Sequence, residues 1–124
     1  MKEMISTKSA PAAIGPYSQG IKTKNLIFLS GQLPINPVTG DMPEKIEDQT
    51  KQSLENIKAI LKSEGLDLSD VIKATVFLSD MENFKLMNDV YKEFFAEPYP
   101  ARSAVEVARL PKDALIEIEV IAAS

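Results

Sequence analysis

Apolar residues recur along the chain with two spacings, and each spacing predicts a different kind of element. Over Glu44–Glu64 they follow one another mostly at intervals of three and four, which is typical of one face of an α-helix. Val71–Leu78 is instead a run of β-branched and aromatic residues and predicts a buried strand. A second helical pattern covers Met81–Glu97, with Asp80 suited to cap its start and Pro98 to stop it. The expected core positions of the two helices are Ile46, Leu54, Ile57, Ile60 and Leu61, then Phe84, Met87, Tyr91, Phe94 and Phe95.

The other apolar segments are short and predict strands separated by irregular stretches. Prolines and glycines interrupt residues 10–16 and 34–43, which disfavours both helix and sheet there. The expected strands are Met4–Thr7, Tyr17–Lys22, Leu26–Gln32, Arg102–Ala108 and Ala114–Ala122, with turns at Lys24-Asn25 and Leu110–Asp113 and a helix cap at Gly65. The order β-β-β-α-β-α-β-β predicts an α+β fold, one domain over residues 1–124, with both helices on one face of a sheet.

The last expected strand has two different faces. One is entirely apolar and must contact the helices; it consists of Ile116, Ile118, Val120 and Ala122. The other consists of Leu115, Glu117, Glu119 and Ile121. Two carboxylates do not suit a core, and two large aliphatic residues do not suit a fully solvated face. We therefore expect a subunit interface that contains a partly desolvated polar site; a solvated edge strand is the alternative. Burial there would raise the pKa of a glutamate and improve it as a base, whereas a nearby arginine would lower that pKa.

Composition limits the chemistry that such a site could carry out. The 124 residues include no cysteine and no histidine, which excludes thiolate nucleophiles, disulfides, Ser-His-Asp triads and histidine zinc sites. The net charge of −4 gives no general attraction to nucleic acids or anionic lipids. No signal peptide is apparent, and no apolar run approaches the roughly 20 residues of a membrane span. We therefore expect a cytoplasmic protein that uses no metal and no cofactor.

Arginine is rare in this chain, which makes its positions informative. Of 14 basic residues only Arg102 and Arg109 are arginines. A guanidinium offers a planar fork that binds a carboxylate through two parallel hydrogen bonds, which an ammonium group cannot do. Arg102 opens a predicted strand and, by alternation, shares a face with Ala104 and Glu106. It is therefore a candidate anion-binding residue; an exposed strand-end arginine, or a salt bridge to a glutamate, is the alternative.

Three further positions are candidates with equally plausible structural roles. Gly31 follows a buried strand, where glycine marks either a bulge or a close approach of the backbone to a ligand or another chain. Asn88 lies near the apolar stripe of the second helix and could bridge buried groups. Tyr17 begins a predicted strand and could either fill the core or reach a site.

Five segments of the chain resemble the RidA (YjgF) family of reactive-intermediate imine/enamine deaminases. They are Ala10–Gly20 (APAAIGPYSQG), Ser30–Gln32 (SGQ), Lys73–Phe77 (KATVF), Pro100–Pro111 (PARSAVEVARLP) and Ile116–Glu119 (IEIE). The resemblance covers essentially the whole chain in unbroken order. It implies a chorismate-mutase-like α+β fold and a homotrimer in which the sheets line a central barrel and three sites fall between subunits. It also implies hydrolysis of 2-iminobutanoate and 2-iminopropanoate, which pyridoxal-phosphate enzymes release, to 2-oxo acids and ammonia.

The resemblance implies roles for individual residues as well. Arg102 resembles the arginine that grips the substrate carboxylate, and Glu117 resembles the glutamate that positions and deprotonates the attacking water. Four more residues match positions that line the pocket or offer backbone groups to the substrate: Tyr17, Gly31, Asn88 and Ala104. Most relatives have cysteine where this chain has Ala104. The role implied for this position is a backbone contact to the substrate, which alanine can make as well as cysteine can.

Other functions are consistent with the same resemblance. Relatives have been linked to control of purine genes, so a non-enzymatic metabolite-sensing or regulatory module is the first alternative. An endoribonuclease or translation inhibitor is the second, and the acidic balance and the lack of histidine argue against it. The sequence neither supports nor opposes a chaperone-like role. Release of ammonia from an imine favours the enzyme, whereas ligand retention without turnover favours the sensor.

Overall fold

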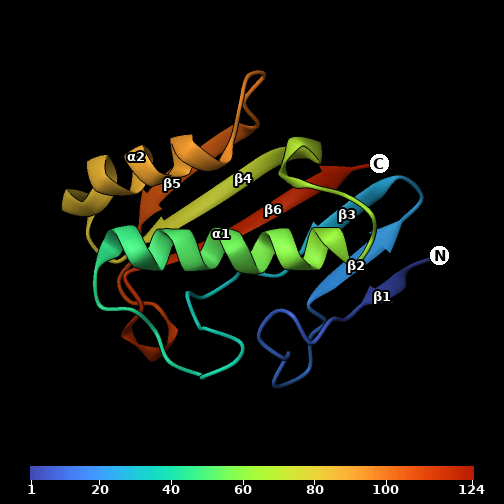
Figure 1. The fold of residues 1–124 in the computed structure, drawn as a ribbon, viewed down its shortest axis with the longest axis horizontal. Helices are drawn as coiled ribbons and strands as arrows, with labels where there is room; N and C mark the ends of the chain where they lie inside the picture. Colours follow the sequence, from blue (N-terminus) through green and yellow to red (C-terminus); the bar gives the residue numbers. More distant parts are fainter.

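The computed structural model describes residues 1–124 as a mixed six-stranded sheet with two α-helices on one face (Figure 1). The strands are β1 (Glu3–Ile5), β2 (Gly20–Thr23), β3 (Leu26–Leu29), β4 (Val71–Leu78), β5 (Ala101–Glu106) and β6 (Ile116–Ala123). The helices are α1 (Ile46–Lys62) and α2 (Phe84–Phe94), and three short 3-10 turns are η1 (Leu68–Asp70), η2 (Met81–Asn83) and η3 (Pro111–Asp113). The predicted α+β class and element order are confirmed.

The last strand lies in the middle of the sheet. The strand order is β1-β2-β3-β6-β4-β5, and β6 runs antiparallel to both β3 and β4. Helix α2 connects β4 to β5, which therefore run parallel and leave β5 as a free edge. Because β6 is central, one of its faces meets both neighbours' core residues while the other lies on the uncovered side of the sheet.

The core lies between the sheet and the helices, as the two spacings predicted. The four apolar residues of β6 that were expected to meet the helices are at most 2% exposed: Ile116, Ile118, Val120 and Ala122. All five expected core positions of α1 are buried, and α2 buries Met87 and Tyr91. Phe95 is buried too, whereas Phe84 and Phe94 are only partly buried and pack against the rim of the core.

Several predicted boundaries were wrong for identifiable reasons. The strand expected from Tyr17 begins at Gly20, because the side chain of Gln19 ties the preceding loop to residues 7–11 instead. The strand expected to reach Gln32 ends at Leu29, and Gln32 forms an isolated bridge to β6. These two segments carry Tyr17 and Gly31, so these two predicted site residues lie on loops rather than on strands.

The second helix also differs from its prediction. The Asp80 side chain accepts a hydrogen bond from the Glu82 backbone at 2.9 Å, as a cap should, but it starts the 3-10 turn η2 before α2 begins. The helix ends at Phe94 rather than Glu97, because Phe95 adopts an extended backbone that keeps its ring buried against Tyr91.

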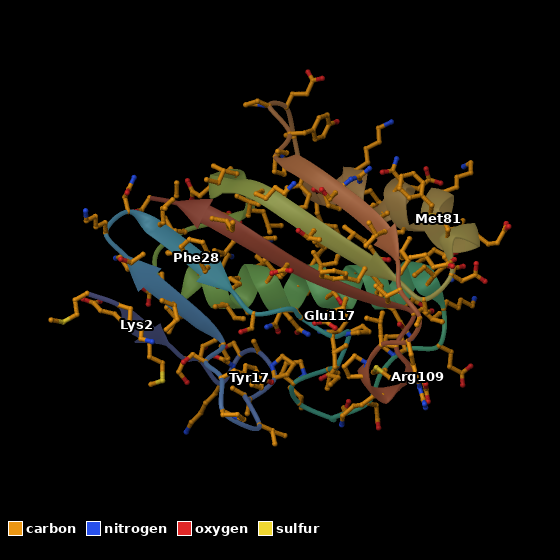
Figure 2. All side chains as sticks on the ribbon, turned by 180° about the vertical axis from the view of Figure 1, so that it is seen from behind. Lys2, Tyr17, Phe28, Met81, Arg109 and Glu117 are labelled. Atoms are coloured by element: carbon orange, nitrogen blue, oxygen red, sulfur yellow. The ribbon has the colours of Figure 1, made fainter.

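No helix covers the other face of the sheet. Figure 2 looks onto this face and shows Phe28 on β3 and Glu117 on β6. Phe28 and Val105 remain 41% and 43% exposed there, and such exposure is unusual for Phe28, whose strand has neighbours on both sides. The mixed apolar and acidic character predicted for this side of β6 is confirmed. Neither helix has the length and apolar content that crossing a membrane requires.

Candidate functional site

The two residues expected to do most of the chemistry lie on opposite faces of the sheet. Ala104 and Ile118 pair with Val76, whose side chain is fully buried under the helices, so Arg102, two residues from Ala104, shares that face. Glu117 pairs with Phe77, the next residue of β4, and therefore faces the uncovered side. Within one chain the structure does not bring Arg102 and Glu117 together; each lines a different hollow.

Glu117 lies in a cleft of about 860 Å³ below the uncovered face. Three predicted site residues line it together: Tyr17, Gly31 and Glu117. The cleft is bounded by the loop before β2, the segment after β3, the turn η3 and the start of β6. The sequence prediction that Tyr17, Gly31 and Glu117 share a site is consistent with this placement.

Gly31 is required by the position of the Glu117 side chain. A Cβ atom at residue 31 would lie 2.9 Å from the Cδ of Glu117 and 3.1 Å from its Cγ, and it would collide with Oε2. Gln32 and Ile118 exchange both backbone hydrogen bonds, at 2.7 and 3.2 Å, which fixes Gly31 beside the carboxyl group. The backbone at Gly31 does make a close approach, but the group that it approaches is a side chain of the same chain and not the ligand or second chain that the sequence interpretation named.

Burial raises the pKa of the Glu117 carboxyl, and the charge of Glu119 on the same face raises it further. No arginine or lysine forms an ion pair with it within the chain, since the two ion pairs present are Lys85–Asp89 and Arg109–Asp113. A carboxylate in this setting accepts a proton more readily than an ordinary surface glutamate does.

Tyr17 lines this cleft and lies on a loop that hydrogen bonds from a buried side chain hold in place. Tyr17 is 53% exposed, so the core-filling interpretation was wrong. The anchor is Gln19, only 4% exposed, whose amide donates to the carbonyls of Thr7 and Pro11 at 3.0 and 2.8 Å and accepts from the Thr7 N–H at 2.7 Å. The Ser30 hydroxyl adds a bond to the Ser18 carbonyl at 2.6 Å.

Sequence reasoning missed both Gln19 and Ser30. A buried glutamine that satisfies backbone groups of a loop breaks the rule that polar residues are exposed, so a hydrophobicity pattern gives no signal for it. The only available signal for both was their place in the segments that resemble the RidA family.

Arg102 lies on the other side of the sheet, between β5 and α2. Its Nη1 donates to Oδ1 of Asn88 at 2.7 Å, and its Cζ lies 4.7 Å from the ring centre of Tyr91 and 5.5 Å from that of Phe84. Arg102 and Asn88 help to line a second hollow of about 480 Å³, together with Tyr91, Lys92, Tyr99 and Pro100. The side chain is half-buried and pairs with no carboxylate, so both alternatives considered for it, an exposed arginine and a salt bridge, were wrong.

Asn88 therefore binds Arg102 rather than standing free in a pocket. Sequence reasoning favoured a bridging amide near the apolar stripe of the second helix, and the structure supplies the group that it bridges to.

The backbone of Ala104 is accessible at the free edge of the sheet. The N–H of Val107 donates to the carbonyl of Leu78 on β4 at 2.8 Å. Peptide groups alternate in direction along a strand, so the N–H of Ala104 points away from β4 and toward the open edge. Alanine presents this group as well as cysteine would.

A third cleft, of about 730 Å³, lies over the C-terminal end of α2 and the neighbouring part of α1. Seven of its sixteen lining residues are lysine, aspartate or glutamate, and it contains none of the predicted site residues. The two hollows that hold Glu117 and Arg102 are therefore the candidate site.

Known proteins resemble the chain over nearly its full length. Residues 7–124 match the family described as Endoribonuclease L-PSP. A RutC family protein of Pyrococcus horikoshii is 61% identical over 98% of both chains. The 2-iminobutanoate/2-iminopropanoate deaminase of Escherichia coli (strain K12) is 52% identical over 98% of both chains. The crystal structure of E. coli TdcF with bound serine superposes with a TM-score of 0.94 at 50% identity, again over 98% of both chains.

Gly31→Ala should destabilise the protein by about 1–3 kcal/mol, the usual range for adding a methyl group to a filled space. Chemical denaturation measures this loss of unfolding free energy. In a Glu117→Ala background the colliding atoms are absent, so the same Gly31→Ala change should cost much less. An equal loss in both backgrounds would show that Gly31 is required for a reason other than the carboxyl group beside it.

Glu119→Gln should lower the pKa of Glu117, because it removes a negative charge that disfavours ionisation of its neighbour. Carboxyl carbon NMR titration of the wild type and the variant measures the shift directly. Glu117 should still titrate above an ordinary glutamate, since burial is the larger cause and is unchanged. A Glu117 pKa that did not move, or that rose, would contradict the assigned causes.

Proposed function

This chain belongs to the family described as Endoribonuclease L-PSP, which is the RidA (YjgF) family that its sequence resembles. From that membership we propose that it hydrolyses 2-iminobutanoate and 2-iminopropanoate to 2-oxo acids and ammonia. The observation that carries the proposal is 52% identity, over 98% of both chains, to an E. coli protein named for this activity. The substrates proposed are small molecules with one carboxylate beside a C=N bond.

The reaction needs little from a catalyst. Water adds to the imine carbon, and the electrons of the C=N π bond pass to nitrogen. The resulting 2-amino-2-hydroxy acid loses ammonia as its C–N bond breaks and the hydroxyl oxygen becomes the 2-oxo group. The imine carbon is already electrophilic, so the catalyst must only hold the carboxylate, orient a water molecule and move protons. The residue types of the two hollows suffice for these tasks.

Glu117 is the proposed general base. Its raised pKa favours acceptance of a proton from the attacking water, and the protonated carboxyl can then return that proton to the departing nitrogen. General-base assistance of this kind contributes roughly 10²–10⁴-fold to a rate. Gly31 and Tyr17, which share the cleft with Glu117, are proposed to line the substrate pocket.

Arg102 is the proposed carboxylate receptor. Asn88 occupies Nη1, and neither Nε nor Nη2 of Arg102 has a partner within the chain. These two nitrogens form the side-on fork of a guanidinium, which matches the two oxygens of a carboxylate. The backbone N–H of Ala104, at the same free edge, is proposed as a further donor to the substrate.

A second copy of the chain is proposed to complete each site. Arg102 and Glu117 face opposite sides of one sheet, yet both must reach a substrate of only a few atoms, so they must come from different copies. The exposed Phe28 and Val105 on the uncovered face supply apolar surface for such an assembly. Arg102 and Glu117 belong to different surfaces, so the contact is heterologous, and such contacts form a ring where the rotation between copies closes. A ring of three copies is the assembly that the family resemblance implies.

Purified protein should accelerate conversion of the imine released by threonine dehydratase, measured as reduced semicarbazide trapping and earlier ammonia release. Arg102→Ala should lower kcat/KM roughly 100-fold or more, since removing one partner of a desolvated charge pair costs several kcal/mol. Arg109→Ala is the matched control, because this exposed arginine pairs only with Asp113 on the surface, and its activity should stay near that of the wild type.

Equal activity of the two arginine variants would remove Arg102 from its proposed role. The competing functions give different results in the same preparation. Retention of a keto acid without turnover by the wild type would favour a sensor, and cleavage of RNA without ammonia release would favour the ribonuclease in the family description.

A further inference from the structure

Helix α2 presents one face to Arg102, and that face is built from three residues. Phe84, Asn88 and Tyr91 follow one another at intervals of four and three, so they lie on one side of the helix. Each of them meets the guanidinium: the two rings at 5.5 and 4.7 Å from Cζ, and the amide through a 2.7 Å hydrogen bond. We call these three residues the guanidinium clamp.

The clamp contains no charged group. A guanidinium at the edge of a core is usually held by an aspartate or glutamate, which would neutralise it. Here an amide oxygen and two aromatic faces hold it, and both attract a cation without cancelling its charge. On α2, Lys85 and Asp89 pair with each other at 3.1 Å, and Lys92, which lines the same hollow as Arg102, carries a charge of the same sign.

Tyr91 contacts Arg102 more closely than Phe84 does and is itself held in place. It is 5% exposed, and its ring lies 4.5 Å from that of Phe95 in the core. Its hydroxyl is buried and has no hydrogen-bond partner within the chain, so the ring supplies the contact that Tyr91 makes with Arg102. Burial raises the pKa of the phenol, which keeps it neutral, and the positive charge of Arg102 partly offsets that rise.

We infer that Tyr91 and Asn88 are positioning residues that hold the Arg102 guanidinium in a fixed orientation while leaving its positive charge for the carboxylate of the substrate. The inference rests on the proposed role of Arg102. It adds that Tyr91 and Asn88 set the orientation of this arginine and its affinity for the carboxylate. It explains why α2 carries a polar Asn88 inside an apolar stripe. It also means that the carboxylate receptor is formed within each chain before any assembly.

The first test is spectroscopic and requires no substrate. The chain has only two arginines, so NMR of the side-chain Nε–H and Cδ–H groups yields two sets of signals, with exposed Arg109 as an internal reference. Aromatic rings near a guanidinium displace its signals. Those of Arg102 should be displaced in the wild type and in Tyr91→Phe, and should move toward those of Arg109 in Tyr91→Leu. Tyr91→Met replaces Tyr91→Leu if the latter does not fold.

The second test is binding of 2-oxobutanoate, measured by calorimetry on the intact protein. Tyr91→Phe should bind within about 2-fold of the wild type, and Tyr91→Leu about 10-fold more weakly, within the range of a desolvated cation–π contact. Asn88→Asp has the same shape but places a carboxylate against Arg102. It should keep or raise thermal stability while weakening 2-oxobutanoate binding at least as much as Tyr91→Leu does.

The two tests separate this inference from the proposed activity. If wild-type 2-oxobutanoate binding depends on Arg102 but Tyr91→Leu leaves both the arginine signals and the affinity unchanged, the clamp is wrong and the carboxylate receptor stands. If Tyr91→Phe is as damaging as Tyr91→Leu, the hydroxyl matters and the inference is overturned. If Arg102→Ala binds 2-oxobutanoate as the wild type does, the proposed role of Arg102 fails, whatever the arginine signals show.

Discussion

Alternation of side chains across a β-sheet is the constraint on which the rest of this structure depends. Neighbouring residues of a strand point to opposite faces, and the register of β5, β4 and β6 fixes which face each residue takes. Arg102 consequently lies under α2, and Glu117 lies on the face that no helix covers. The two groups that suit hydrolysis of an imino acid are thus kept apart in each chain, and the proposed site requires a second chain to unite them.

This separation also keeps both charges unpaired within a single chain. If Arg102 and Glu117 were neighbours in one chain, they would form an ion pair that lowered the pKa of the glutamate and occupied the fork of the arginine. Instead Glu117 has a raised pKa from burial and from Glu119, and Arg102 is held by an amide and two rings. Within a single chain, therefore, neither the base nor the anion receptor forms an ion pair, and the two can meet only across a boundary between copies.

The sequence predicted the features that depend on periodicity. The two helices, the buried face of β6 and the shared face of Arg102 and Ala104 all follow from spacings of three, four and two. It could not predict that β6 would lie between β3 and β4, because pairing of strands distant in the chain leaves no local pattern. For that reason the opposite placement of Arg102 and Glu117 emerged only from the structure.

Polar contacts were the other features that the sequence could not supply. The loop that carries Tyr17 depends on the buried amide of Gln19, and the strand predicted there was wrong because such an amide satisfies the loop's backbone groups without a ladder. Asn88 was expected to be a bridging amide, but its partner could be identified only in three dimensions. Likewise, Gly31 marks a close approach from sequence, whereas the carboxyl group that requires it comes from a segment far along the chain.

The most direct test of the account is to combine two inactive variants, Arg102→Ala and Glu117→Gln, by refolding them together and assaying imine hydrolysis. If each site takes Arg102 from one copy and Glu117 from the next, some sites of a mixed ring regain both residues. Random mixing in equal amounts should then restore about a quarter of wild-type activity, because each intact residue is present at a given site half the time. A mixture that stays as inactive as either variant alone, although the chains co-assemble, would mean that the two residues do not act across a boundary between copies.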